Sequence, residues 1–202
     1  MDSGKEVDNA EADNVVEILT AGPKVNNCTF SNDGKFLLIA SVCGYQVLSI
    51  DDTGACTLQY ATAQRMSITL IQCALTGKLV LFAPTTDASN LYIEDYDKEE
   101  VVAKLGYYGP IQDVLANHGM FVVAVNTQLY IYRLEGVQPI SQLTYVLSPF
   151  ALSNDPINCY VAHCDGNLTG CVVVQDVEQQ SLTIRILAHR SGSSFFRLVL
   201  SL

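Results

Sequence analysis

The chain has 202 residues, of which 49% are hydrophobic and 16% are charged, and its 21 acidic residues against 11 basic ones give a formal net charge of −10. This composition is typical of a folded globular domain with a sizeable core and argues against a wholly disordered chain. The negative charge disfavours non-specific attraction to nucleic acid or to an anionic membrane surface, so any binding of lipid or phosphate must be local.

The first segment, residues 1–14, is polar, acidic and without periodicity, and it is predicted to be a disordered tail. It lacks the apolar core of a signal peptide, and no run in the chain approaches the roughly 18 apolar residues that a membrane span needs. The seven cysteines form no C-x-x-C pair, which favours free thiols in a reducing compartment. These features predict a cytoplasmic protein.

A strand is expected at residues 15–19, and a hairpin pattern then begins at Asn32-Asp33-Gly34-Lys35, which separates two apolar runs. Asp-Gly between such runs is a strong hairpin signal, because the turn needs a positive φ that glycine adopts at little cost. The pattern recurs about every 42 residues. Its later turns are predicted at Thr76-Gly77, at His118-Gly119 and, more weakly, around Asp155-Pro156.

Each repeat continues into a third and a fourth β-rich run, and no stretch shows a convincing helical period. Four strands per unit at this period predict an all-β chain that forms a partial β-propeller, with about four four-stranded blades and the first strand of a fifth. The incomplete, WD40-like propeller is expected over residues 15–202, and its blades are expected at about 25–62, 66–105, 110–147 and 149–189, with the start of the fifth at 193–202.

Enzyme chemistry finds little support in the sequence. His118 lies in a predicted turn, and His163-Cys164 lacks the two further ligands that a metal site would need. None of the usual nucleophile, phosphate-loop or zinc motifs occurs. The sequence therefore predicts no enzyme, no metal and no cofactor.

An acidic run at residues 93–100 joins the third and fourth strands of the second predicted blade. It is either a solvated hairpin that protects a strand edge with charge, or a docking surface for a basic segment of a partner. Tyr107-Tyr108, before Gly109-Pro110, could form the wall of a groove or simply pack. The predicted protein-interaction residues are Asp95, Asp97, Glu99, Glu100, Tyr107 and Tyr108.

Several stretches resemble one family in the same order along the chain. "CTFSNDGKFLLIASVCGYQVLSID" resembles the first blade of the PROPPINs, the phosphoinositide-binding autophagy propellers, and "GPIQDVLANHGMFVVAVNTQLYIYRL" resembles their third. "GCVVVQD" and "AHRS" are similar to the fourth blade and to the step into the fifth. The resemblance covers about residues 25–202, whereas the Trp-Asp signature of ordinary WD40 blades is missing, because the chain contains no tryptophan.

The resemblance implies a seven-bladed propeller that binds phosphatidylinositol 3-phosphate and 3,5-bisphosphate on membranes and recruits autophagy proteins such as the lipid-transfer partner. In the family the lipid sites surround a Phe-Arg-Arg-Gly motif in the fifth and sixth blades, and this sequence does not contain it. Arg197 in "FFRLVLS" is not equivalent to it. Of the family's lipid contacts, only His189 has a counterpart here, and alone it makes an incomplete phosphoinositide site.

These observations leave two hypotheses. The first is that the chain is the N-terminal portion of a PROPPIN-like autophagy adaptor, present here as a truncated gene model, a short isoform or a fragment. The full-length form would then bind lipid at autophagic or endosomal membranes. The alternative is a WD40-type scaffold that binds proteins and no lipid.

Overall fold

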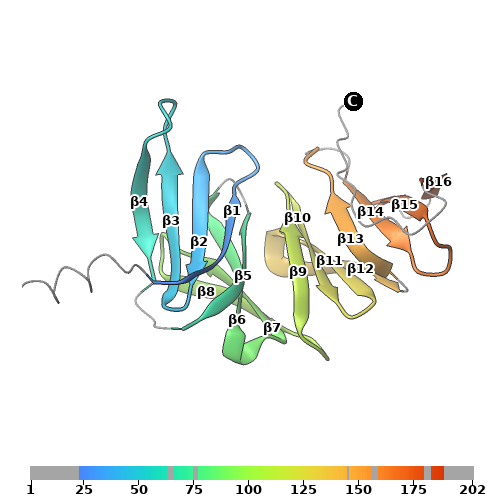
Figure 1. The fold of residues 1–202 in the computed structure, drawn as a ribbon, viewed down its shortest axis with the longest axis horizontal. Helices are drawn as coiled ribbons and strands as arrows, with labels where there is room; N and C mark the ends of the chain where they lie inside the picture. The colour runs from blue at the N-terminus through green and yellow to red at the C-terminus, as the bar shows by residue number, and fades with distance from the viewer. Residues whose placement is uncertain are drawn as a thin grey trace, which may run out of the picture.

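The computed structural model describes residues 23–62, 66–74, 77–144, 146–155, 159–179 and 183–188. In these residues four separate four-stranded antiparallel sheets follow one another along the chain (Figure 1). The predicted tail at 1–14, the strand at 15–19, His189 and the fifth-blade strand at 193–202 lie outside the described residues.

Every sheet is a simple meander in which strands that are adjacent in sequence pair with each other. The first blade consists of β1 (Val25–Phe30), β2 (Phe36–Ser41), β3 (Gly44–Ile50) and β4 (Cys56–Ala61). The second blade consists of β5 (Ile68–Ala74), β6 (Leu79–Pro84), β7 (Asn90–Asp95) and β8 (Glu100–Gly106), with the 3-10 turn η2 (Thr85–Asp87) between β6 and β7.

The third and fourth blades repeat this arrangement. The third consists of β9 (Ile111–Ala116), β10 (Met120–Val125), β11 (Gln128–Arg133) and β12 (Gln138–Thr144), with the 3-10 turn η3 (Glu135–Val137) before the last strand. The fourth consists of β13 (Val146–Leu152), β14 (Tyr160–Asp165), β15 (Cys171–Asp176) and β16 (Thr183–Leu187). The predicted all-β partial propeller is thus confirmed.

The part of the chain described contains no α-helix, and hence no helix long and apolar enough to cross a membrane.

The second strand of the third blade is covered on both faces by the neighbouring blades. All six residues of β10, "MFVVAV", are buried, whereas the outermost strand β4 is exposed along almost its whole length. A strand that is buried on both faces reads as a nearly continuous apolar run, because no position faces water. The hydrophobic core accordingly lies between successive blades, in one cluster for each of the three blade contacts.

Side chains near the first strands and their turns join different blades. Asn26 Nδ2 on β1 donates to the Ile68 carbonyl on β5 over 2.9 Å. Asn117 Nδ2, in the turn of the third blade, donates to the Ser153 carbonyl of the fourth over 2.9 Å. Asn32, in the first turn, donates to the Ala116 carbonyl of the third blade over 3.0 Å. These bonds hold the inner edges of the blades together.

The first three predicted hairpin turns form by two different devices, while Pro156 of the fourth lies outside the described residues. Gly34 and Gly77 have φ values of 71° and 94°, in the left-handed region that favours glycine, while Thr76 lies outside the described residues. In the third hairpin the residue with the turn-forming role is Asn117. Its Oδ1 atom accepts hydrogen bonds from the backbone N–H groups of Gly119 and Met120, at 3.0 and 2.8 Å.

The buried position of His163 in the fourth blade predicts a dependence of stability on pH. The ring is 7% exposed on β14, and its Nδ1 atom lies 3.0 Å from the Cys164 carbonyl oxygen. Burial lowers the pKa of His163 below its ordinary value of 6.5, although the backbone contact and Asp165 oppose this. The unfolded chain therefore binds a proton more readily than the folded one.

We expect the free energy of unfolding to be undiminished above about pH 6.5 and to fall as the pH drops further, since protonation then favours the unfolded chain. Urea unfolding followed by circular dichroism at pH 8, 6.5 and 5.5 measures this. His163→Gln should flatten the profile in that interval. An unchanged slope in the variant would show that His163 is not the responsible group.

Candidate protein-interaction surface

The acidic run forms the hairpin between β7 and β8, which we call the acidic hairpin (residues 95–100). Its turn is closed by Lys98 N–H donating to the Asp95 carbonyl over 3.2 Å, and Glu99 adopts a φ of 53°. Tyr96 is 8% exposed, and its ring centroid lies 5.7 Å from that of Tyr60 on β4. The hairpin is therefore anchored on the first blade by an aromatic contact.

The acidic side chains of this hairpin differ in their availability. Lys98 Nζ donates to Asp95 Oδ2 over 2.6 Å, and this hydrogen bond lowers the pKa of Asp95 below its usual range. Asp97, Glu99 and Glu100 are exposed, and none forms an ion pair with a basic residue in the described ranges. Three carboxylates of the hairpin are thus free to meet a basic partner, while Asp95 already has one.

The predicted aromatic pair divides into one packed and one exposed ring. The ring centroid of Tyr107 lies 5.0 Å from that of Tyr130 on β11, and its N–H donates to the Ser89 carbonyl over 2.9 Å. Tyr108 is fully exposed, with a relative accessibility of 104%. Tyr107 therefore helps to join the second blade to the third, and only Tyr108 presents a ring to solvent.

The structure does not bring the two predicted groups together. Glu100 begins β8, and Tyr107 follows its last residue, Gly106. Seven residues of extended strand span roughly 20 Å. The acidic hairpin and Tyr108 are therefore two separate positions at opposite ends of β8.

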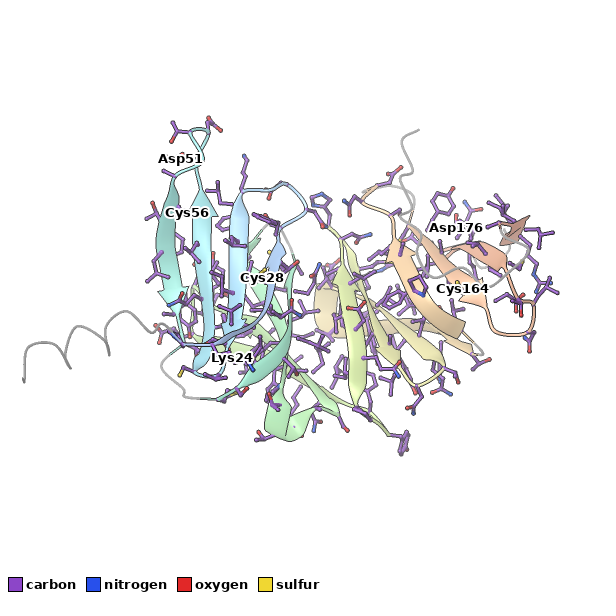
Figure 2. The ribbon with its side chains drawn as sticks, viewed as in Figure 1. Lys24, Cys28, Asp51, Cys56, Cys164 and Asp176 are labelled. Carbon is purple, nitrogen blue, oxygen red and sulfur yellow. The ribbon has the colours of Figure 1, made fainter. Side chains whose placement is uncertain are left out.

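A second acidic turn shows what a purely structural carboxylate looks like in this fold. Figure 2 shows Asp51 at the tip of the hairpin between β3 and β4. Its Oδ1 atom accepts hydrogen bonds from the N–H groups of Thr53 and Ala55, both at 2.9 Å. The Asp51 carboxylate thus accepts hydrogen bonds from the backbone of its own turn, whereas those of Asp97 and Glu100 have no such structural role among the described residues.

The sequence reasoning missed Glu94, which precedes the acidic hairpin on β7. Its side chain is among the few buried charged groups, with 8% exposure, and its Oε1 atom accepts from the Tyr60 hydroxyl over 3.1 Å. Strand alternation could have revealed it. Leu91 and Ile93 belong to the core toward the third blade, so Tyr92 and Glu94 must lie on the opposite face, toward the first.

Two buried cysteines are not activated as nucleophiles. Burial raises the pKa of the thiols of Cys73 and Cys159 to about 11, so both are protonated and weakly nucleophilic at neutral pH. Within the described ranges, no three His, Cys, Asp or Glu side chains are grouped so as to hold a metal ion. His189, the predicted lipid contact, lies outside these ranges.

Comparison with known proteins gives a likeness in structure only. No family model matches the sequence, and no curated protein matches it either. Hsv2 of Kluyveromyces marxianus superposes with a TM-score of 0.71 at 14% identity, covering 85% of this chain and 50% of that structure. Hsv2 of Kluyveromyces lactis gives a TM-score of 0.68 at 13% identity, covering 84% of this chain and 52% of that one.

The chain has the fold of the PROPPIN propellers. KlAtg21, solved as a complex with the coiled coil of AgAtg16, is a further match, with a TM-score of 0.68 at 15% identity over 84% of this chain and 57% of that one. The chain thus spans about half the length of the solved structures that it matches. The predicted resemblance to PROPPINs is confirmed at the level of fold.

Proposed function

We propose that this chain is part of a PROPPIN-like autophagy adaptor, whose full-length form binds phosphatidylinositol 3-phosphate or 3,5-bisphosphate on membranes while the described blades dock protein partners. The observation that carries the proposal is the match of successive blades to Hsv2 over 85% of the chain. The complex of KlAtg21 with the AgAtg16 coiled coil adds support for an autophagy protein as partner. The adaptor would be cytoplasmic, with peripheral association to autophagic or endosomal membranes.

The acidic hairpin is the surface that we assign to protein docking. Its exposed carboxylates project from the β7–β8 turn, and the net charge of −10 adds a field that attracts basic segments. Tyr108 offers a second, aromatic contact at the other end of β8. A partner that touched both would have to follow the outer edge of the second blade.

We expect the double variant Asp97→Asn, Glu100→Gln to weaken binding of the AgAtg16 coiled coil by roughly 2- to 30-fold, since each of the two exposed charge pairs contributes about 0.2–1 kcal/mol. Isothermal titration calorimetry at two salt concentrations measures the loss. The matched control is Asp52→Asn, Glu135→Gln, which removes two exposed charges elsewhere. Equal weakening by both variants would mean that net charge matters and the hairpin does not.

Lipid binding makes a sharper prediction. The 202-residue chain is expected not to float with liposomes containing phosphatidylinositol 3-phosphate, because it lacks the Phe-Arg-Arg-Gly pair of arginine forks and carries a net charge of −10. A longer protein, encoded by the same open reading frame beyond residue 202, should float if the added residues contain the Phe-Arg-Arg-Gly motif. Flotation on a density gradient, with phosphatidylinositol liposomes as control, gives the answer.

Two results would change this assignment. Specific flotation of the 202-residue chain that is abolished by His189→Ala would place the lipid site within this sequence. An extended form that contains the remaining blades and still does not float would favour the alternative, a WD40-type scaffold that binds proteins only.

A further inference from the structure

A cavity of about 300 Å³ lies between the first and second blades. Its walls come from β3 and β4 on one side, from β5 to β8 on the other, and from the segment that joins the blades. Aromatic rings dominate these walls, and the single buried charge among them is Glu94. The lining consists of Tyr45, Tyr60, Thr62, Met66, Ile68, Phe82, Tyr92, Glu94, Glu99 and Val101.

Two polar side chains of this cavity, Glu94 and Tyr45, are incompletely satisfied. Glu94 accepts one hydrogen bond, from the neutral Tyr60 hydroxyl, and no lysine or arginine in the described ranges forms an ion pair with it. The Tyr45 side chain is 2% exposed, and its buried hydroxyl lies near Glu94 and Tyr60 but makes no hydrogen bond within 3.5 Å among the described residues. A buried carboxylate is destabilising unless a cation pairs with it. This site therefore favours a ligand that carries a positively charged hydrogen-bond donor.

The rings around this carboxylate suit a cation. The centroid of Tyr45 lies 5.6 Å from that of Tyr60 and 5.4 Å from that of Phe82, with the ring planes tilted by 42° and 40°. Aromatic faces attract cations through their quadrupole, most strongly where water is excluded. Tyr92 already accepts one such contact, since Lys104 Nζ lies 4.8 Å from its ring centroid.

We propose that this cavity binds the guanidinium group of an arginine side chain from a basic segment of a protein partner. A planar guanidinium stacks on aromatic rings and carries five donors, enough to reach Glu94 and the Tyr45 hydroxyl together. Met66 and Ile68 supply apolar wall for the aliphatic stem. The choice of a protein partner rests on the proposed function, whereas the recognition of the cation does not.

The acidic hairpin lies beside the cavity and would attract a basic segment of a partner toward it. Glu99 belongs both to that hairpin and to the cavity lining, and it is exposed. Asp97 and Glu100 lie in the same exposed turn, where the one cation, Lys98, is already paired with Asp95, so the hairpin beside the cavity carries a net negative charge. A basic segment could place one arginine in the cavity while its neighbouring cations meet the hairpin.

Small probes test the cavity on the full 202-residue chain without a known partner. Amide and methyl chemical-shift titrations compare n-butylguanidinium with N-butylurea, which has nearly the same shape and no charge. We expect the guanidinium to bind at least about tenfold more tightly, as a hydrogen bond to a charged group contributes roughly 1.5–3 kcal/mol. Equal affinities would overturn the inference, and tighter binding of n-butylammonium would overturn the assignment to arginine.

Variants then locate the site. Glu94→Gln keeps the shape of the side chain and should reduce n-butylguanidinium affinity at least about tenfold. Asp52→Asn removes the same charge from an exposed position and should leave the affinity within about twofold. An unchanged affinity in a folded Glu94→Gln variant would place the binding elsewhere. Guanidinium binding by a chain that does not bind the coiled coil would support the cavity and contradict the proposed function. Coiled-coil binding without guanidinium binding would do the opposite.

Discussion

Replacing Phe121 by alanine is expected to lower the free energy of unfolding by about 3–5 kcal/mol, because a large ring would leave a cavity that the sheets cannot fill. Phe121 lies on β10 with 0% exposure, inside the core cluster shared by the second and third blades. Its ring stacks on Tyr132, with centroids 4.8 Å apart and planes 9° from parallel. Both the sheet and the contact between blades depend on it.

Urea unfolding followed by circular dichroism measures this loss, and Tyr108→Ala is the matched control. Both changes remove one aromatic ring. Phe121 is buried on β10, whereas Tyr108, between β8 and β9, is fully exposed. Its replacement should stay within about 0.5 kcal/mol. Similar losses in the two variants would contradict the placement of Phe121 between blades and would remove the argument that Tyr108 is free for a partner.

The strands could be predicted from sequence because the signals that define a blade are local. Asp33-Gly34 specifies a turn by backbone conformation alone, and "MFVVAV" indicates a strand without a solvent face. Repetition of these signals then predicts a propeller, since one such sheet cannot bury both faces by itself. None of this requires knowledge of how one blade sits on the next.

The candidate site was less predictable because it depends on contacts between blades. The sequence places Tyr107 and Tyr108 side by side, but only the packing of the second blade on the third decides that Tyr107 is covered and Tyr108 is not. Glu94 reads as one more residue of an acidic run. Its burial follows from the approach of Tyr60, a residue of another sheet.

The acidic hairpin fits both interpretations made from the sequence: a solvated turn that protects a strand edge, and a docking surface for a basic partner. Asp95 is used within the turn by Lys98, and so behaves as a structural carboxylate. Asp97 and Glu100 have no such role in the described ranges and project from an edge of the second blade. An edge that is charged in this way resists pairing with another strand while it remains available to a basic partner.

Gly77→Ala is expected to destabilise the protein more than the equivalent change at Gly34. Both glycines have positive φ, 94° and 71°, so alanine pays a conformational penalty of about 1–2 kcal/mol at either position. The surroundings differ. A Cβ atom at Gly34 would meet nothing within 4 Å, whereas one at Gly77 would lie 2.5 Å from Cδ2 and Cε2 of the Phe36 ring.

The second cost arises because the half-buried Phe36 ring would have to shift. This ring belongs to the first blade and packs against the core between the first two blades. A clash with the new methyl group of Gly77→Ala should therefore lower the free energy of unfolding by a further ~1–3 kcal/mol. A double-mutant cycle with Phe36→Leu isolates this strain, since the smaller side chain should relieve part of it and make the two changes less than additive. Equal losses for Gly77→Ala and Gly34→Ala, together with strict additivity, would mean that the close approach of the two blades at Gly77 does not exist in solution.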